Sequence, residues 1–143
     1  SSVINEYLVM YERYCEQFKT LSPFLIYAAN AVETEGGNLD DRLNDRLGTL
    51  VSMCSSRARI DVFAEAIDNG RRNAITHDDY LIDPIDETVE LNVNGEDEVF
   101  SYSEVRDLSV EARCAAQSLF VFPVLLDHKE NLRELAELQE ELD

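Results

Sequence analysis

The stretch RRNAITHDDY, residues 71–80, marks the point where the sequence changes from a helical to a strand-like pattern. Before it, apolar residues recur every three or four positions, as on one face of an α-helix: Ile60, Phe63, Ala64 and Ile67. After it, Val89, Leu91 and Val93 alternate with polar residues, which is the period of a β-strand. The stretch also holds His77, one of only 2 histidines in the chain. We therefore expect it to end a helix, either as a chemical site or as an ordinary terminus.

Upstream of this stretch the pattern is helical throughout. A first apolar stripe has spacings of four and three: Ile4, Leu8, Tyr11, Cys15 and Phe18. The Ser22-Pro23 pair predicts that this helix is kinked or restarts there, and the glycines at 36–37 predict its end. Asn38 or Asp40 can then cap a second helix. Its apolar stripe is Leu43, Leu47, Leu50 and Cys54.

Downstream, the segment TVELNVNGEDEVFSYSE, residues 88–104, predicts a short β-hairpin or extended excursion over residues 79–102. Its loop, NGEDE, is longer than a two-residue turn. Ser103 is placed to cap a long helix. Leucines at positions 132, 135, 138 and 142 predict an amphipathic C-terminal helix over residues 128–143.

The length and composition favour one helical domain. The chain has 143 residues, no Trp, 5 Gly and 3 Pro, which argues against a loop-rich or all-β fold. We expect a single domain over residues 1–143, an all-α bundle of four or five helices with one short β excursion.

The charge is strongly acidic, with a formal net value of −18. Lys is nearly absent, since only Lys19 and Lys129 occur, and the acids are spread along the whole chain. This pattern resembles proteins of salt-loving archaea, whose concentrated salt screens self-repulsion. A mesophilic acidic protein is the alternative.

Other sequence features limit the class of protein. Cys15, Cys54 and Cys114 lack C-x-x-C spacing and lie in apolar helical contexts, which predicts buried free thiols in a reducing cytoplasm. The sequence shows no apolar leader, and its longest apolar run is half a membrane span, so we expect a soluble, cytoplasmic protein without a membrane segment. Metal-ligand spacings, glycine-rich phosphate loops and nucleophile elbows are also lacking, so we expect no metal and no cofactor.

The stretch contains the motif Arg72-Asn73-Ala74-Ile75-Thr76-His77, an R-x4-H pattern with a polar residue directly after the arginine. At the end of a helix in a small helical domain, this motif resembles the HEPN family (higher eukaryotes and prokaryotes nucleotide-binding domain). Its members are compact helical bundles in which Arg-polar-x(3 to 5)-His closes a central helix. The resemblance extends over the order of the helices, and its sequence specificity lies in residues 71–80.

The resemblance implies a metal-independent endoribonuclease whose active site forms between two copies of the chain. Such cleavage requires activation of the ribose 2′-hydroxyl, compensation of charge on the phosphorane and protonation of the 5′-oxygen. His77 is the expected proton-transfer group and Arg72 the expected phosphate clamp, so these two are the candidate catalytic residues. Asn73 and Arg71 are the candidate substrate contacts. Since Arg72 and His77 would lie about 140° apart in a continuous helix, the helix must end or bend near Thr76.

A variant within the family implies a partner. In toxin–antitoxin pairs of a HEPN toxin with a nucleotidyltransferase, the toxin carries R-x4-H-x-Y, and its tyrosine is adenylylated. In this chain Tyr80 stands one position further along. Tyr80 is therefore the candidate modification site, and a nucleotidyltransferase-like antitoxin is a candidate partner, beside a homodimer and an RNA substrate.

An ordinary structural explanation stands beside the chemical one. Basic residues near a helix C-terminus interact favourably with the helix dipole, so His77 and the two arginines also fit a plain helix end. The chain would then be a catalytically inactive helical module for dimerisation, nucleotide binding or partner-protein binding. His128 has no comparable setting, and we expect it to be solvated.

The acidic charge opposes RNA binding, which gains free energy from neutralised phosphates. Residues 57–72 hold four arginines and three acids, whereas residues 78–98 hold nine acids and no base. Asp78 and Asp79 would repel a phosphate at His77 unless they pair with Arg71 or Arg72.

The spread of acids generates a first prediction. The melting temperature should rise as KCl increases from tens of millimolar to molar concentration, because the Debye length falls to roughly 3 Å near 1 M. Thermal unfolding followed by circular dichroism measures this. A flat or falling curve would exclude adaptation to high salt.

Overall fold

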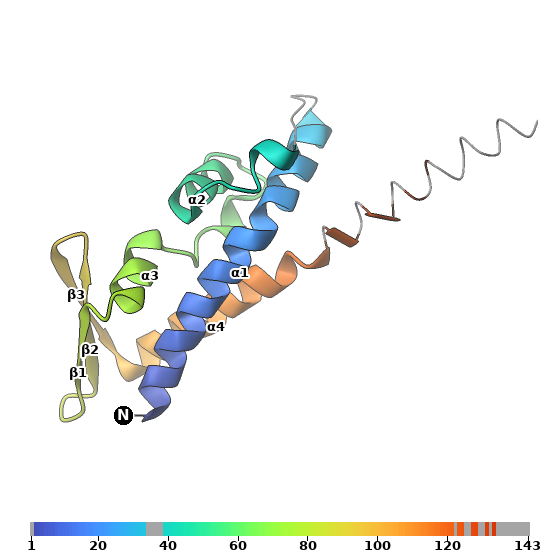
Figure 1. Ribbon diagram of the computed structural model, residues 1–143. Coiled ribbons are helices and arrows are strands. Elements are labelled where there is room, and N and C mark those ends of the chain that lie inside the picture. The colour runs from blue at the N-terminus through green and yellow to red at the C-terminus, as the bar shows by residue number, and fades with distance from the viewer. Residues whose placement is uncertain are drawn as a thin grey trace, which may run out of the picture.

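The computed structural model describes residues 2–33, 39–121, 123–124, 127–128, 131 and 133. Its elements are α1 (Ser2–Glu33), η1 (Leu39–Asp41), α2 (Leu47–Ser55), η2 (Asp61–Phe63), α3 (Asn69–Thr76), β1 (Tyr80–Asp83), β2 (Thr88–Val93), β3 (Glu96–Ser101) and α4 (Tyr102–Ser118). Figure 1 shows α1 and α4 side by side, with α3 between α1 and the sheet.

The expected all-α class is wrong, because the fold is mixed α/β. Strands β1, β2 and β3 form an antiparallel sheet in that order, and β2 packs against α3. The alternating residues Val89, Leu91 and Val93 are buried in the main hydrophobic core. The segment expected as an excursion therefore forms one layer of the domain.

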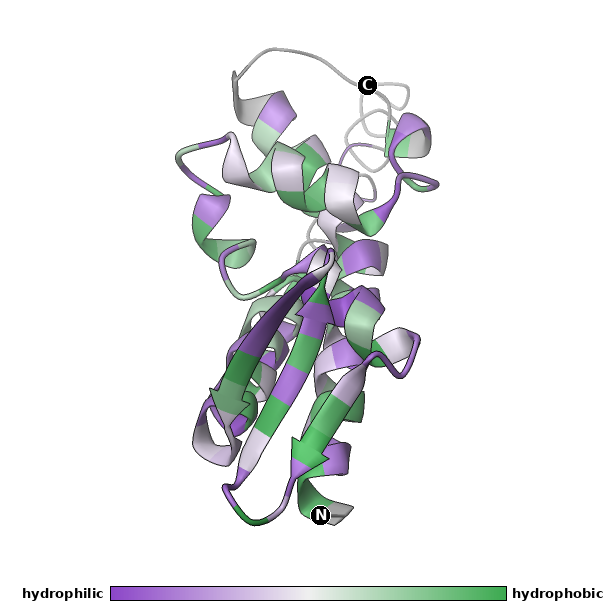
Figure 2. Ribbon diagram, turned by 90° about the vertical axis from the view of Figure 1, so that its left-hand side faces the viewer, coloured by the Kyte–Doolittle hydropathy of each residue, from purple (hydrophilic) through white to green (hydrophobic). Residues whose placement is uncertain are grey.

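A tight turn sets the register of the sheet. Asn94 and Gly95 both have positive φ, at 57° and 88°, and Val93 pairs with Glu96 across them. This is a two-residue turn, whose twist matches that of the flanking strands. The prediction of a longer NGEDE loop is thus wrong, since its three acids belong to β3. Figure 2 faces the outer side of the sheet, where apolar and polar bands alternate along the strands.

Helix α1 supplies the largest share of the core, and α4 packs against it. The predicted α1 stripe is buried along its whole length, from Ile4 to Phe18. The helix continues through Pro23 without restarting, and Ser22 and Pro23 are both buried. Helix α4 begins with a capping box in which Ser101 accepts from the Glu104 N–H, so Ser101 takes the role expected of Ser103.

The region between the long helices is more broken than its apolar periodicity predicts. The second helix begins only at Leu47, after a short 3-10 turn, and Leu43 is left exposed. The stripe that runs from Ile60 to Ile67 lies in a 3-10 turn and loops. Asp68 then starts α3 as its N-cap. The motif therefore ends a helix of 8 residues.

Two of the three cysteines are buried, as expected. Burial raises the pKa of the Cys15 thiol to about 12 and that of Cys54 to about 11. Cys114, however, is exposed on α4. The predicted helix stop at 36–37, the cap at Asn38 and the leucines of the expected 128–143 helix lie outside the described residues. Among the described residues, none of the helices combines the length and the apolar character needed to cross a membrane.

The close packing of α3 on the sheet generates a second prediction. A Cβ at Gly70 would lie 2.7 Å from Val93 Cγ1 and 2.9 Å from Asn94 Nδ2. Gly70→Ala should therefore lower the free energy of unfolding by about 1–3 kcal/mol, although alanine favours helices. Urea denaturation measures it.

Gly48→Ala is the matched control in α2. Its Cβ would meet Asn69 Nδ2 at 3.4 Å, an ordinary contact. This variant should gain about 0.5–1 kcal/mol from helix propensity. Equal gains in both variants would contradict the close approach of α3 to the hairpin.

Candidate functional site

Helix α3 is fixed at its N-terminus before the motif begins. The Asp68 side chain accepts a hydrogen bond from the Arg71 N–H at 2.8 Å, which caps the helix. The Asp68 N–H donates to the hydroxyl oxygen of Tyr11 at 3.0 Å. Tyr11 is a buried residue of α1, and burial raises the pKa of its phenol. The start of α3 is thus bonded to the neutral phenol of a core tyrosine.

The two consecutive arginines point to different elements. Arg71 donates from Nε to Glu98 Oε2 of β3 at 2.8 Å, and its guanidinium lies 5.1 Å from the centroid of the Phe100 ring. Arg72 instead forms an ion pair with Glu16 of α1. The side chain of Arg72 is 19% exposed and that of Glu16 is 47% exposed. Adjacent residues therefore join α3 to the sheet on one side and to α1 on the other.

Asn73 and Thr76 complete the contacts of this helix. The Asn73 side-chain oxygen accepts from Arg72 Nη1 at 2.8 Å, so this amide orients the arginine and does not hold the imidazole. The Thr76 hydroxyl donates to Glu12 Oε1 at 2.8 Å. Glu12 and Glu16 are four residues apart on α1, which places them on one face. That face holds α3 along its length.

His77 lies where the helix ends. Helix α3 stops at Thr76, and His77 has φ −95° and ψ 10°, outside the helical region. Its N–H donates to the Asn73 carbonyl oxygen at 3.0 Å, and the residue is exposed. Within the described part of the chain, the imidazole has no hydrogen-bond partner. The expected helix end near Thr76 is therefore confirmed, and the imidazole is accessible.

The surface beside His77 is acidic. A cavity of about 310 Å³ adjoins it, lined by Asp78, Asp79, Tyr80, Leu81, Glu90, Asn92 and Asp97. Asp78 has a positive φ of 55°, and the Asp79 N–H donates to the Ala74 carbonyl oxygen at 2.8 Å. The two arginines pair with Glu16 and Glu98, so they do not neutralise Asp78 and Asp79. An anion reaching His77 from the sheet side would meet uncompensated carboxylates.

The structure brings some of the predicted site residues together and separates others. Arg72 and Asn73 contact each other, and His77 follows at the end of the same helix. Arg71 turns to the sheet, where Glu98 and Phe100 occupy its guanidinium. Tyr80 is half-buried as the first residue of β1.

Sequence reasoning missed Glu12 and Glu16. They lie 64 and 56 positions from their partners. Their i, i+4 spacing on the polar side of α1 is the only local sign, and it does not identify a partner.

The described residues include no group of three or more His, Cys, Asp or Glu side chains able to hold a metal ion. Comparisons of the chain with protein-family models, curated proteins and solved structures found no match. The HEPN resemblance therefore rests on residues 71–80 and on the helix that they end.

The ion pair between α1 and α3 generates a third prediction. Glu16→Arg and Arg72→Glu should each lower the free energy of unfolding by about 1–3 kcal/mol, because each leaves like charges in contact in a half-buried place. The double variant should regain most of the loss. Urea denaturation at constant KCl measures the cycle.

Arg113→Glu is the control for the change in net charge. Arg113 is exposed on α4 and donates to Gln117. Its reversal should stay within about 0.5 kcal/mol. If the loss of unfolding free energy in the double variant equals the sum of the two single losses, the Glu16–Arg72 pair does not couple α3 to α1.

Proposed function

We propose that this chain is a HEPN-type, metal-independent endoribonuclease of the defence or toxin–antitoxin kind, with its site formed between two copies. Arg72 and His77 are the reacting residues. Support comes from one observation above all: α3 ends at Thr76, which leaves the His77 imidazole exposed beside a helix whose arginine is held in a fixed orientation.

The chemistry follows from the two side chains. A neutral His77 removes the proton from a ribose 2′-hydroxyl, whose oxygen attacks the adjacent phosphorus. The bond from phosphorus to the 5′-oxygen breaks, and a protonated His77 from the second copy donates its proton to the leaving oxygen. The products are a 2′,3′-cyclic phosphate and a 5′-hydroxyl. Arg72 compensates the charge that builds on the phosphorane oxygens.

The proposed reaction needs two copies because each copy carries one motif histidine, His77, for two proton transfers. A twofold arrangement would also place two Arg72 guanidinium groups near one phosphate. This would offset part of the repulsion from Asp78 and Asp79. Concentrated cations would screen the remainder, consistent with the acidic composition.

Tyr80 gives the proposal a regulatory form. Tyr80 is three residues after His77 in the chain, and it lines the acidic cavity described above. Adenylylation of this phenol would add a bulky anion next to the imidazole and block access of RNA. A nucleotidyltransferase-like antitoxin would act in this way.

A second function is favoured by the contacts of Arg72. Its guanidinium is already paired with Glu16, and the cavity beside His77 is lined by carboxylates. Both features suit a catalytically inactive module in which the motif holds α3 in place. In that case the exposed His77 would be a plain helix end.

The proposal generates a fourth prediction. In molar KCl with EDTA, the chain should cut single-stranded RNA and leave 2′,3′-cyclic phosphate ends. His77→Ala should lower the rate by about 10²- to 10⁴-fold, because it removes proton transfer. Arg72→Lys keeps the charge beside Glu16 but loses the planar fork, and should lower the rate by about 10²-fold. Mass spectrometry of the cleaved ends identifies the cyclic phosphate, and the amount of this product over time gives the rate for each variant.

The matched control is His128→Ala, which removes the other histidine, an exposed residue, and should cut at the wild-type rate. Light scattering in the same buffer should give twice the chain mass of 16.3 kDa. A folded wild type that leaves every RNA uncut would support the inactive module. A monomer that cuts RNA would remove the composite site.

A further inference from the structure

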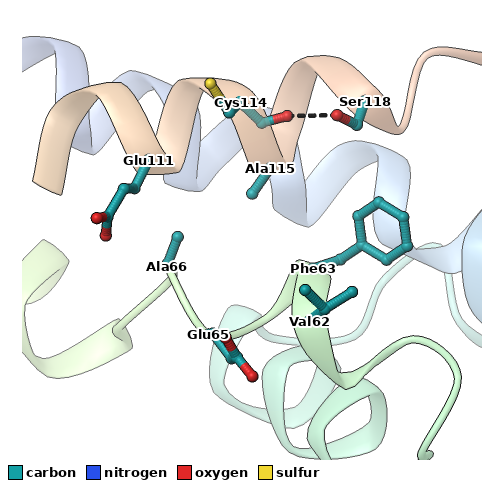
Figure 3. A pocket seen from close by; sticks show the side chains of 8 residues that line it. All are labelled: Val62, Phe63, Glu65, Ala66, Glu111, Cys114, Ala115 and Ser118. Atoms are coloured by element: carbon teal, nitrogen blue, oxygen red, sulfur yellow. Dashed lines mark hydrogen bonds between the residues drawn. The ribbon is translucent and has the colours of Figure 1, made fainter. Parts of the chain in front are cut away.

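A groove beside the loop that leads into α3 has no part in the proposed reaction. It lies between the segment around η2 and α4, and has a volume of about 550 Å³. Its lining is Val62, Phe63, Glu65, Ala66, Glu111, Cys114, Ala115 and Ser118. Figure 3 shows Ala66 and Ala115 pointing toward each other across it. The groove is open because both walls present methyl groups where larger side chains would close it.

The groove has an exposed large apolar side chain in its own lining, and two more follow its last lining residue along the chain. Val62 is 59% exposed, and Phe120 and Val121, just past the last lining residue of α4, are 50% and 47% exposed. Exposed apolar side chains that line a groove mark a candidate interaction surface.

Each wall of the groove also carries a carboxylate. Glu65 comes from the loop after η2, and Glu111 comes from α4. Both are exposed, and neither forms an ion pair within the described residues. An apolar floor between two unpaired acids is complementary to an apolar ligand edged with cations.

We propose that this groove binds an amphipathic α-helix of a partner protein, with an apolar stripe facing the alanines and Lys or Arg on both flanks. A helix packing along α4 would fill the space between Ala66 and Ala115 with one row of apolar side chains. Its flanking cations would reach Glu65 and Glu111.

Charge excludes the two occupants that the chain itself could supply. A second copy packed through the same groove would bring two pairs of Glu65 and Glu111 carboxylates together, with like charges in contact. Residues 128–143, the expected C-terminal amphipathic segment, hold six acids against the two bases Lys129 and Arg133, a net charge of −4. Both therefore have the wrong sign for this groove.

The probe is a fluorescein-labelled synthetic helix of about 18 residues made of Leu and Lys, with the leucines on one face. Binding is followed by fluorescence anisotropy in about 1 M KCl, because this salt screens long-range attraction between the probe and the acidic protein and leaves direct contacts. The wild type should bind this helix. A peptide of the same composition with its leucines scattered around the helix should bind at least about tenfold more weakly.

Two charge-matched variants locate the contact. Glu111→Lys should raise the Kd at least about tenfold, whereas Glu90→Lys, on the outer face of the sheet, makes the same change in net charge and should leave it unchanged. Ala66→Phe, which fills the groove, should abolish binding while circular dichroism remains native. If Ala66→Phe does not fold, the exposed pair Glu111→Lys and Glu90→Lys decides alone.

Three outcomes would overturn the proposal. Equal weakening by Glu90→Lys, or equal binding of the scattered peptide, would mean that general charge attraction holds the probe. No binding by the wild type would mean that the groove is not a helix site. Dissociation of a dimer by Ala66→Phe in sedimentation would assign the groove to a second copy.

Discussion

Arg71 and Arg72 are adjacent in α3, and neighbours in an α-helix point about 100° apart. One therefore reaches Glu98 on the sheet and the other reaches Glu16 on α1. A helix of 8 residues is too short to be stable alone, so these contacts, with the buried Ala74 and Ile75, hold it in place. The exposure of His77 follows, because the fixed helix ends before it.

The two arginine ion pairs also determine the charge around His77. Each arginine is compensated by a carboxylate from another element, so neither neutralises Asp78 or Asp79. Since the sheet side of His77 is acidic, the proposed RNA substrate would have to approach from the opposite side, where a second copy would add its own arginine. In the proposed reaction, the Arg72 guanidinium would have to bind a phosphate while it is paired with Glu16, which its several N–H donors allow.

The two proposed surfaces are built from different residues. The proposed catalytic site, around Arg72 and His77, is formed by α3 and the residues that follow it. The groove is formed by the segment around η2 and by α4. Yet Ala66 is only two residues before Asp68, the N-cap of α3. A partner helix in the groove would therefore contact the loop that fixes the start of the motif helix.

The sequence by itself determined the elements whose pattern is long and regular. The stripe from Ile4 to Phe18 and the alternation from Val89 to Val93 follow from their period. The end of α3 near Thr76 is expected because Arg72 and His77 can converge only if the helix ends or bends there. Only the tertiary structure decided the mixed class. Strand β1 has four residues and becomes a strand by pairing with β2. The Asn94-Gly95 turn closes a tight hairpin because the three acids that follow it pair with β2 as part of β3. The partners of Arg71 and Arg72 lie 27 and 56 positions away, and such contacts arise only when the chain folds α1 and the sheet onto α3.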